Sequence, residues 1–457
     1  MAFAPVHVVG GGLAGCEAAW QLAERGLDVV LHEMRPARTT PAHTTDQLAE
    51  LVCSNTFKST ELASAHGLLK AECCALGSLI LAAAESVRVP AGTALAVDRT
   101  RFAEVVTTRI RAHPRIRVET GEVTAVPSPG IVATGPLTSD ALAASIQARL
   151  GSASLAFYDA IAPIVDVESI DANVVFRASR YGKETDGGEA GILARTEGAY
   201  LNCPFTRDEY ERFVDALLGA DQHQGHDFDR VPYFEGCLPI EVIAARGRES
   251  LRFGPMKPVG LSDPRTGRRP YAVVQLRAED RGQRMWNLVG FQTRLRIPEQ
   301  QRVLRMVPGL ERAEFLRPGS IHRNTYLNAP ATLSPVLGQR DDPGVLFAGQ
   351  LTGVEGYTES MATGLVAGIN LARIIAGDAP VVPPETTMIG ALYRYLRDAD
   401  PARFQPMNAN FGLLDDPPQA PRDRIRKREL IAERALADLA SWRDALGIAP
   451  MAVTSGA

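Results

Sequence analysis

Cysteine is scarce in this chain, with six among 457 residues, at positions 16, 53, 73, 74, 203 and 237. Six is too few for a disulfide framework, and their spacing does not resemble that of a zinc site. Disulfide scaffolds and zinc modules are therefore excluded. We expect free thiols, a reducing compartment and no bound metal.

Long hydrophobic runs are also missing. The longest apolar stretch lies around Ala75–Ala84, well short of the roughly 20 residues that span a bilayer. Residues 1–12 contain no basic segment followed by a long apolar one, so no secretory signal is predicted. The sequence thus predicts a cytoplasmic protein with no membrane contact.

Neither sign of charge is in large excess. Lysine plus arginine number 49 and aspartate plus glutamate 53, so the net charge is −4, which by itself argues against a polyanionic partner. The 45% hydrophobic and 22% charged residues are close to globular averages, which excludes disordered and collagen-like chains. At roughly 100–200 residues per domain, the length fits two to four domains, or one large α/β domain with an insertion.

The N-terminus has the pattern of a nucleotide site. Val6–Val9 predicts a strand, residues 16–25 a helix, and residues 28–33 a second parallel strand that ends in Glu33. The turn between the first strand and the helix consists of Gly10, Gly11, Gly12, Leu13, Ala14 and Gly15. It fits G-x-G-x-x-G, in which the backbone approaches a pyrophosphate at a helix N-terminus. Glu33 stands where a carboxylate that accepts from a ribose hydroxyl is expected.

Two later segments favour FAD over NAD. Residues 344–350 predict a strand that ends in Gly349 and Gln350, and Gly356 and Tyr357 precede a small-residue helix from about 360 to 375. Residues 131–135 predict another strand, which ends in Gly135. In FAD enzymes of the Rossmann type a late segment returns to the flavin, and this pairing resembles that arrangement. Three unrelated strand ends are the alternative.

These elements predict an α/β fold whose doubly wound parallel sheet forms a Rossmann-type FAD-binding domain. We expect residues 1–160 to form the first part of this domain. Residues 326–457 would form its second part, together with a C-terminal helix. Residues 161–325 would be an inserted α+β domain.

Two cysteines lie in unusual surroundings. Cys53 lies in the polar stretch 51–59, where Lys58 could support a thiolate. Cys237 lies between a glycine and Leu-Pro, with acids and aromatics on both sides, as in a loop over a pocket. Both are candidate catalytic thiols. The cysteines at 16, 73 and 74 lie in predicted helices, where small apolar packing explains them.

Charge is unevenly spread along the chain. Residues 246–323 contain 17 basic residues, 16 of them arginine, against seven acidic ones, for a net charge of +10. Arginine suits forked contacts with phosphate, so this stretch predicts a nucleic-acid surface. Surface charge paired with acids is the alternative. A second basic cluster at 422–428 opens a predicted helix and could also be a solvated helix start.

Several segments together resemble the bacterial folate-dependent tRNA (uracil-5-)-methyltransferases, a flavoprotein family. The matching segments are 10–33, 51–59, 234–241, 252–261, 322–326 and 349–364. Those around Cys237 and Met256 are specific to the family, whereas 349–364 is shared with a larger flavoprotein that modifies the wobble uridine of tRNA. The length of this chain favours the methyltransferase.

The resemblance implies methylation at C5 of the T-loop uridine, position 54, of tRNA. The carbon would come from 5,10-methylenetetrahydrofolate and the electrons from FAD that NADH or NADPH reduces. Cys237 would be the thiolate that adds to C6 of uracil, and Cys53 the second thiol, at the flavin face. Arg252 and Lys257 would contact folate or RNA phosphate, with Arg323 as a further substrate contact. Glu241 would transfer a proton.

Other functions remain open from the residues alone. A flavin oxidoreductase acting on a small molecule would carry the same glycine motifs, and its arginines would be incidental. An RNA-binding protein could keep FAD as a structural element. A wobble-uridine flavoprotein is the third alternative.

Overall fold

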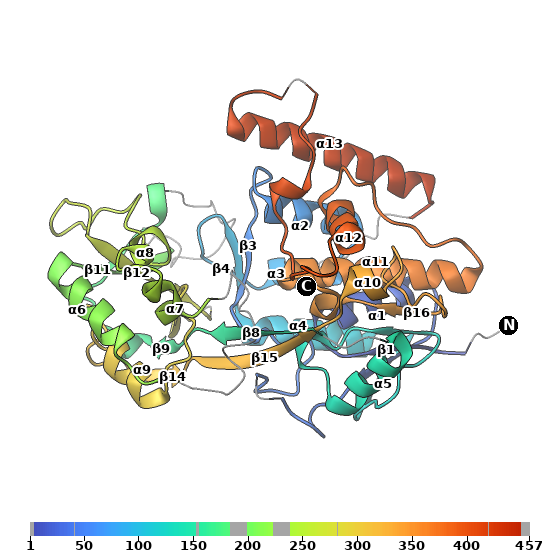
Figure 1. The fold of residues 1–457 in the computed structure, drawn as a ribbon, viewed down its shortest axis with the longest axis horizontal. Helices are drawn as coiled ribbons and strands as arrows, with labels where there is room; N and C mark the ends of the chain where they lie inside the picture. The colour runs from blue at the N-terminus through green and yellow to red at the C-terminus, as the bar shows by residue number, and fades with distance from the viewer. Residues whose placement is uncertain are drawn as a thin grey trace.

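The computed structural model describes residues 4–40, 42–151, 155–182, 199–222, 238–280, 282–418 and 420–448, and the side chains of 155–161 and 320–325 are left aside. Two sheets dominate these residues, and each has its own hydrophobic core. We call the part around the first sheet the parallel-sheet region. The part between residues 162 and 318, around the second sheet, is the antiparallel-sheet region (Figure 1).

The first sheet has five parallel strands in the order β16-β7-β1-β2-β6. They are β1 (Val6–Val9), β2 (Val29–Glu33), β6 (Ile116–Thr120), β7 (Gly130–Val132) and β16 (Val345–Phe347). The chain order reverses between β1 and β7, and ligands of such sheets bind outside the carboxyl ends of the strands at this point. The predicted doubly wound α/β fold of the Rossmann type is confirmed.

Helices from both ends of the chain belong to the parallel-sheet region, so blue and red segments lie together in Figure 1. They are α1 (Leu13–Glu24), α2 (Ala65–Ala75), α3 (Leu79–Ser86), α4 (Arg99–Ala112), α5 (Asp140–Leu150), α10 (Ala329–Thr332), α11 (Tyr357–Ala376), α12 (Met388–Asp398) and α13 (Arg424–Ala445). A small sheet of β3 (Thr56–Ser59), β5 (Ala94–Val97) and β4 (Arg88–Val89) lies toward the antiparallel-sheet region.

The second sheet has six strands, each antiparallel to its neighbours, in the order β10-β11-β12-β13-β9-β14. They are β9 (Ile164–Asp166), β10 (Phe176–Arg177), β11 (Tyr200–Phe205), β12 (Ala272–Ala278), β13 (Met285–Leu288) and β14 (Phe315–Arg317). The helices of this region are α6 (Arg207–Leu218), α7 (Ile240–Ala245), α8 (Ser250–Phe253) and α9 (Ile297–Leu304). Every residue of β12 is buried, so this strand lies at the centre of the core.

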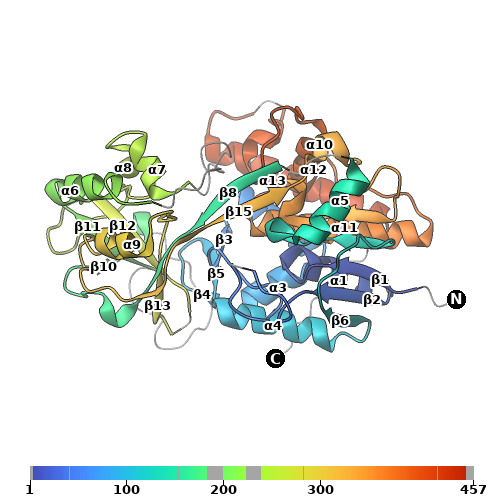
Figure 2. The same cartoon turned by 60° about the horizontal axis from the view of Figure 1, so that its bottom comes forward.

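Two long paired strands join the two regions. They are β8 (Leu155–Ile161) and β15 (Ser320–Tyr326), which pair antiparallel along their whole length. Figure 2 shows them side by side as they run from one region to the other. The chain therefore leaves the parallel-sheet region and returns to it at neighbouring points.

Within the described part of the chain, no single helix is long and apolar enough to cross a membrane. Among the described residues, only α2 and α3 taken together have the length and apolar composition of a membrane span, and the chain bends by 112° between them. Their apolar residues belong to the core of the parallel-sheet region.

Candidate functional site

The N-terminal glycine turn is built by close backbone contacts. A Cβ on Gly15 would lie 1.8 Å from the carbonyl oxygen of Gly10, and a Cβ on Gly10 would lie 2.6 Å from that of Ala133. Gly10 also has a φ of +105°, which side chains rarely tolerate. By contrast, a Cβ on Gly12 would meet nothing within 4 Å. The turn therefore has no room for side chains at Gly10 and Gly15, whereas the space beside Gly12 is open.

Glu33 is held in place by its neighbours at the end of β2. Its Oε2 accepts from the Gly11 amide at 3.0 Å, and its Oε1 accepts from Nε of Arg35 at 3.0 Å. Burial tends to raise the pKa of Glu33, but the hydrogen bonds and charge of Arg35 lower it below its ordinary value. The carboxylate is thus ionised and oriented beside the turn. Sequence reasoning missed Arg35, which a second acid, Glu50, holds at 3.1 Å.

The second glycine segment packs directly against the first. A Cβ on Gly364 in α11 would lie 2.2 Å from the carbonyl oxygen of Ala14, and one on Gly368 would lie 2.8 Å from that of Ala18. A Cβ on Gly349 would lie 3.0 Å from the Ala14 side chain. The two segments, more than 300 residues apart in sequence, therefore meet at the carboxyl end of the sheet.

The helix ends show where an anion fits. Most described helices of eight or more residues begin with a side chain that accepts from a first-turn amide, namely Ser64, Ser78, Asp98, Ser139, Thr206, Thr387 and Asp423. The helices α1 and α11 begin instead at Gly12 and Gly356, which cannot cap in this way. Because no side chain caps these two helix starts, their first-turn amides suit a phosphate or an electron-rich ring. The residues present therefore fit FAD.

A pocket lies in front of the turn. Its lining includes Gly10, Gly11, Gly12, His32, Glu33, Arg35, Thr134, Thr138 and Ser139. These residues come from the ends of β1, β2 and the segment after β7, as the chain reversal requires. Gly135 begins a short turn with a φ of +66° directly beside this pocket.

Cys53 lies in a loop of residues 51–55, the Cys53 loop, directly before β3. The amides of Cys53 and Ser54 both donate to the hydroxyl oxygen of Tyr357, at 2.9 and 3.1 Å. Tyr357 is the first residue of α11, and burial raises the pKa of its hydroxyl. The backbone of the loop that carries the predicted thiol is thus in direct contact with the predicted second cofactor segment.

The carbonyls of the same loop accept from two arginines. Arg99 donates to the oxygen of Leu51, and Arg317 donates to that of Val52 at 2.9 Å. Arg99 also grips Glu279, with Nε and Nη2 at 2.9 and 2.6 Å from one carboxylate oxygen. Sequence reasoning missed all three charged residues, because their partners lie far away in the chain. The only signal was the basic composition around Arg317.

The other predicted substrate residues have different surroundings. Both oxygens of Glu241 are used inside the antiparallel-sheet region, one by the amide of Arg294 and one by Thr293. Burial raises the pKa of Glu241. The guanidinium of Arg252 lies 3.7 Å above the Tyr271 ring and pairs with Glu249. These contacts give both residues a structural task.

Three predicted site residues remain, namely Lys257, Cys237 and Arg323. Lys257 is exposed on the antiparallel-sheet region. Cys237 and the side chain of Arg323 lie outside the described residues.

The basic stretch is largely paired with acids. Arginines of this stretch that form salt bridges are Arg248, Arg252, Arg265, Arg277, Arg284, Arg294, Arg296 and Arg302. Among the described residues, Lys257, Arg268, Arg269 and Arg312 are exposed and form no salt bridge. In the second cluster Arg426 and Lys427 are paired with acids, which favours a solvated helix start.

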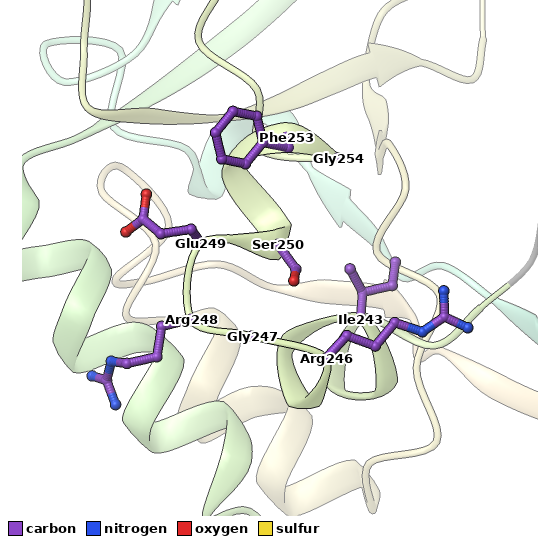
Figure 3. Close-up of a pocket in the computed structure, with 8 residues that line it drawn as sticks. All are labelled: Ile243, Arg246, Gly247, Arg248, Glu249, Ser250, Phe253 and Gly254. Carbon is purple, nitrogen blue, oxygen red and sulfur yellow. The ribbon is translucent and has the colours of Figure 1, made fainter.

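A hollow of about 590 Å³ lies between α7 and α8 (Figure 3). It is lined by Ile243, Arg246, Gly247, Arg248, Glu249, Ser250, Phe253 and Gly254. Figure 3 shows the Phe253 ring at its rim, with Arg246 and Arg248 pointing to opposite sides. Phe253 is 81% exposed, an unusual position for a phenylalanine.

Comparison with known proteins gives concordant matches. The family model described as "Glucose inhibited division protein A" matches residues 5–379. A Geobacter sulfurreducens protein named methylenetetrahydrofolate--tRNA-(uracil-5-)-methyltransferase TrmFO is 56% identical over 439 residues, which cover 96% of this chain and 98% of that protein. A Desulforudis audaxviator protein of the same name is 56% identical over 443 residues, with the same coverage of both chains.

Solved structures of GidA from Aquifex aeolicus have the same fold. In two crystal forms they match with TM-scores of 0.70 and 0.69 at 17% identity. The match covers 97% of this chain but only 74% and 76% of those chains. This chain is therefore shorter than GidA, whereas it spans nearly the whole of the two methyltransferases.

Proposed function

This chain belongs to the TrmFO family of methylenetetrahydrofolate--tRNA-(uracil-5-)-methyltransferases, within the broader glucose inhibited division protein A family. We propose that it methylates C5 of the T-loop uridine, position 54, in tRNA. The carbon donor is 5,10-methylenetetrahydrofolate and the reductant is FAD that NADH or NADPH reduces. The observation that carries this proposal is the contact of Cys53 with Tyr357 at the start of the second glycine segment.

The residues that would hold FAD come from the two glycine segments. The open amides at Gly12 would take the pyrophosphate, and Glu33 would accept from the ribose. Gly349, Gln350 and Gly356 would line the flavin side, where α11 begins. When bound and reduced, FAD supplies the electrons that convert the transferred methylene to a methyl group.

The two thiols would handle the uracil. C5 of uracil is a poor nucleophile until a thiolate adds at C6 and makes an enolate. We assign this addition to Cys237. Cys53, which the Tyr357 hydroxyl and two arginines hold in place, would assist transfer of the methylene or release of the product. The target uridine must leave its stack to reach these groups.

The exposed cations of the antiparallel-sheet region would bind the tRNA backbone. Lys257, Arg268 and Arg269 are available for phosphate because they form no salt bridge within the part of the chain that the structure describes. The exposed ring of Phe253 suits stacking on an unpaired base. Arg252 would support this face through its stack on Tyr271. We place the protein in the cytoplasm, where reduced thiols and tRNA occur together.

The test is methyl transfer to a tRNA transcript with labelled methylenetetrahydrofolate, FAD and NADH or NADPH. We expect label in 5-methyluridine, and none when labelled S-adenosylmethionine is the donor. Cys53→Ala and Cys237→Ala should each lose on the order of 10²-fold or more of the rate. Cys74→Ala, a change of an exposed thiol on α2, is the matched control. Near-normal activity of Cys237→Ala would refute the assignment of the nucleophile.

A further inference from the structure

The Cys53 loop is held from both regions of the molecule. Its amides donate to Tyr357 of the parallel-sheet region. One of its carbonyls accepts from Arg317, which ends β14 in the antiparallel-sheet region. The loop is therefore hydrogen-bonded to both regions at once.

The last residue of the loop makes a second connection of the same kind. The amide nitrogen of Asn55 donates to the carbonyl oxygen of Ala278 at 2.9 Å. Its amide oxygen accepts from Nε of Arg277 at 2.8 Å. Ala278 and Arg277 both belong to β12, and Asn55 is fully buried. Its side-chain nitrogen also donates to the carbonyl oxygen of Val97 in β5 at 2.9 Å, so this one side chain is hydrogen-bonded to both regions.

Arg99 belongs to the parallel-sheet region but is oriented by the other one. It starts α4, and its guanidinium spans the Leu51 carbonyl and the Glu279 carboxylate. Glu279 directly follows β12 and is 1% exposed. A buried ion pair of this kind is costly to break, because the remaining charge is left without a partner. A forked contact also requires arginine, since lysine offers only a point charge.

We propose that Arg317 and Arg99 are positioning residues that hold Cys53 for methyl transfer and make its placement depend on the seating of the antiparallel-sheet region. This inference rests on the role of Cys53 in the proposed function. Binding of tRNA to the antiparallel-sheet region would then act on the thiol through Arg317 and the Arg99–Glu279 pair. Neither arginine touches the reacting atoms in this scheme.

The test measures amide hydrogen exchange of peptides covering residues 51–57 in the full-length protein, together with kcat and KM for tRNA. Arg317→Met keeps an unbranched apolar stem but removes the guanidinium and its donors. We expect exchange in this segment to accelerate about tenfold or more, the effect of losing a charged hydrogen bond. We expect kcat to fall by a similar factor while KM for tRNA stays within about twofold. Arg317→Lys, which retains the charge and a donor group on a shorter side chain, should be intermediate.

Arg305→Met is the matched control, because Arg305 also donates to a backbone carbonyl, that of Ala313, but within its own region. It should leave exchange in residues 51–57 and kcat unchanged. Arg99→Lys provides a second test if Arg317→Met folds poorly, and the same local acceleration is expected. Wild-type exchange in this segment for both variants would overturn the proposal, as would acceleration spread evenly over the chain. Exchange needs no substrate, so a wild-type enzyme without methylation activity would refute the proposed function alone.

Discussion

Gly15 in the parallel-sheet region and Arg317 in the antiparallel-sheet region show two ways of building one site. Gly15 matters because it has no side chain, so that α1 can approach the Gly10 carbonyl. Arg317 matters because it has a long charged side chain that reaches the Val52 carbonyl. The parallel-sheet region forms the candidate phosphate site from closely packed glycine backbone. The antiparallel-sheet region holds the Cys53 loop by the long side chain of Arg317. The contact of Gly15 with Gly10 is local in sequence, whereas the contact of Arg317 with Val52 is not.

The largest effect is expected from a pair of glycine substitutions that disrupt the candidate phosphate site in different ways. Gly15→Ala places a Cβ 1.8 Å from a backbone oxygen, so we expect a loss of about 3 kcal/mol or more in the free energy of unfolding and a colourless protein. Gly12→Ala places its Cβ in open space. We expect it to keep the stability of the apoprotein within about 1 kcal/mol but to lose flavin, because the Cβ occupies the approach to the pyrophosphate.

Thermal unfolding of the two apoproteins and the flavin absorbance of the two preparations measure this contrast. A fully yellow Gly12→Ala protein would contradict the placement of the pyrophosphate.

A middle-sized effect is expected from the exposed cations of the antiparallel-sheet region. The triple change Lys257→Gln, Arg268→Gln and Arg269→Gln should weaken tRNA binding and flatten the dependence of log Kd on log salt. Each phosphate contact that is lost should change the slope by about 0.7–0.9. Filter binding over a series of salt concentrations measures it.

The control for this series is Arg296→Gln together with Arg302→Gln, because both of these arginines already pair with acids. If the control changed the slope of log Kd against log salt equally, salt bridges to acids would not determine which arginines bind RNA.

The smallest effect is expected from the buried carboxyl group of Glu72 in the parallel-sheet region, which influences how stability depends on pH. Glu72 of α2 accepts from the amides of Met388 and Ile389 at 2.7 and 2.9 Å, and burial raises its pKa to about 7. The folded state therefore holds this proton more tightly than the unfolded state, so stability falls as pH rises from about 4.5 to about 7. In Glu72→Gln this loss between pH 5 and pH 8 should shrink by on the order of 1 kcal/mol.

Urea unfolding of the wild type and the variant at both pH values measures the difference. An identical pH dependence in Glu72→Gln would show that other groups cause it.

The uneven charge of the chain was a correct signal that needed the structure to interpret. A net charge of −4 for the whole chain hides the +10 of residues 246–323. Most of the described arginines in that stretch turn out to be structural, since acids pair with them or carbonyls accept from them. Among the described cations of the stretch, only a few, such as Lys257 and Arg269, stay exposed without a salt bridge to an acid. Counting charge along a sequence cannot separate these classes, because pairing depends on which surfaces face each other.

By itself the sequence determined the Rossmann-type sheet, the glycine turn and the family. Each of these depends on a short run of residues whose steric needs hardly depend on the rest of the chain. Only the tertiary structure decided what holds Cys53. Tyr357 lies 304 positions from Cys53, and Glu279 lies 180 positions from Arg99. No local pattern encodes such contacts, because the first joins distant segments of one core and the second forms only when the two cores come together.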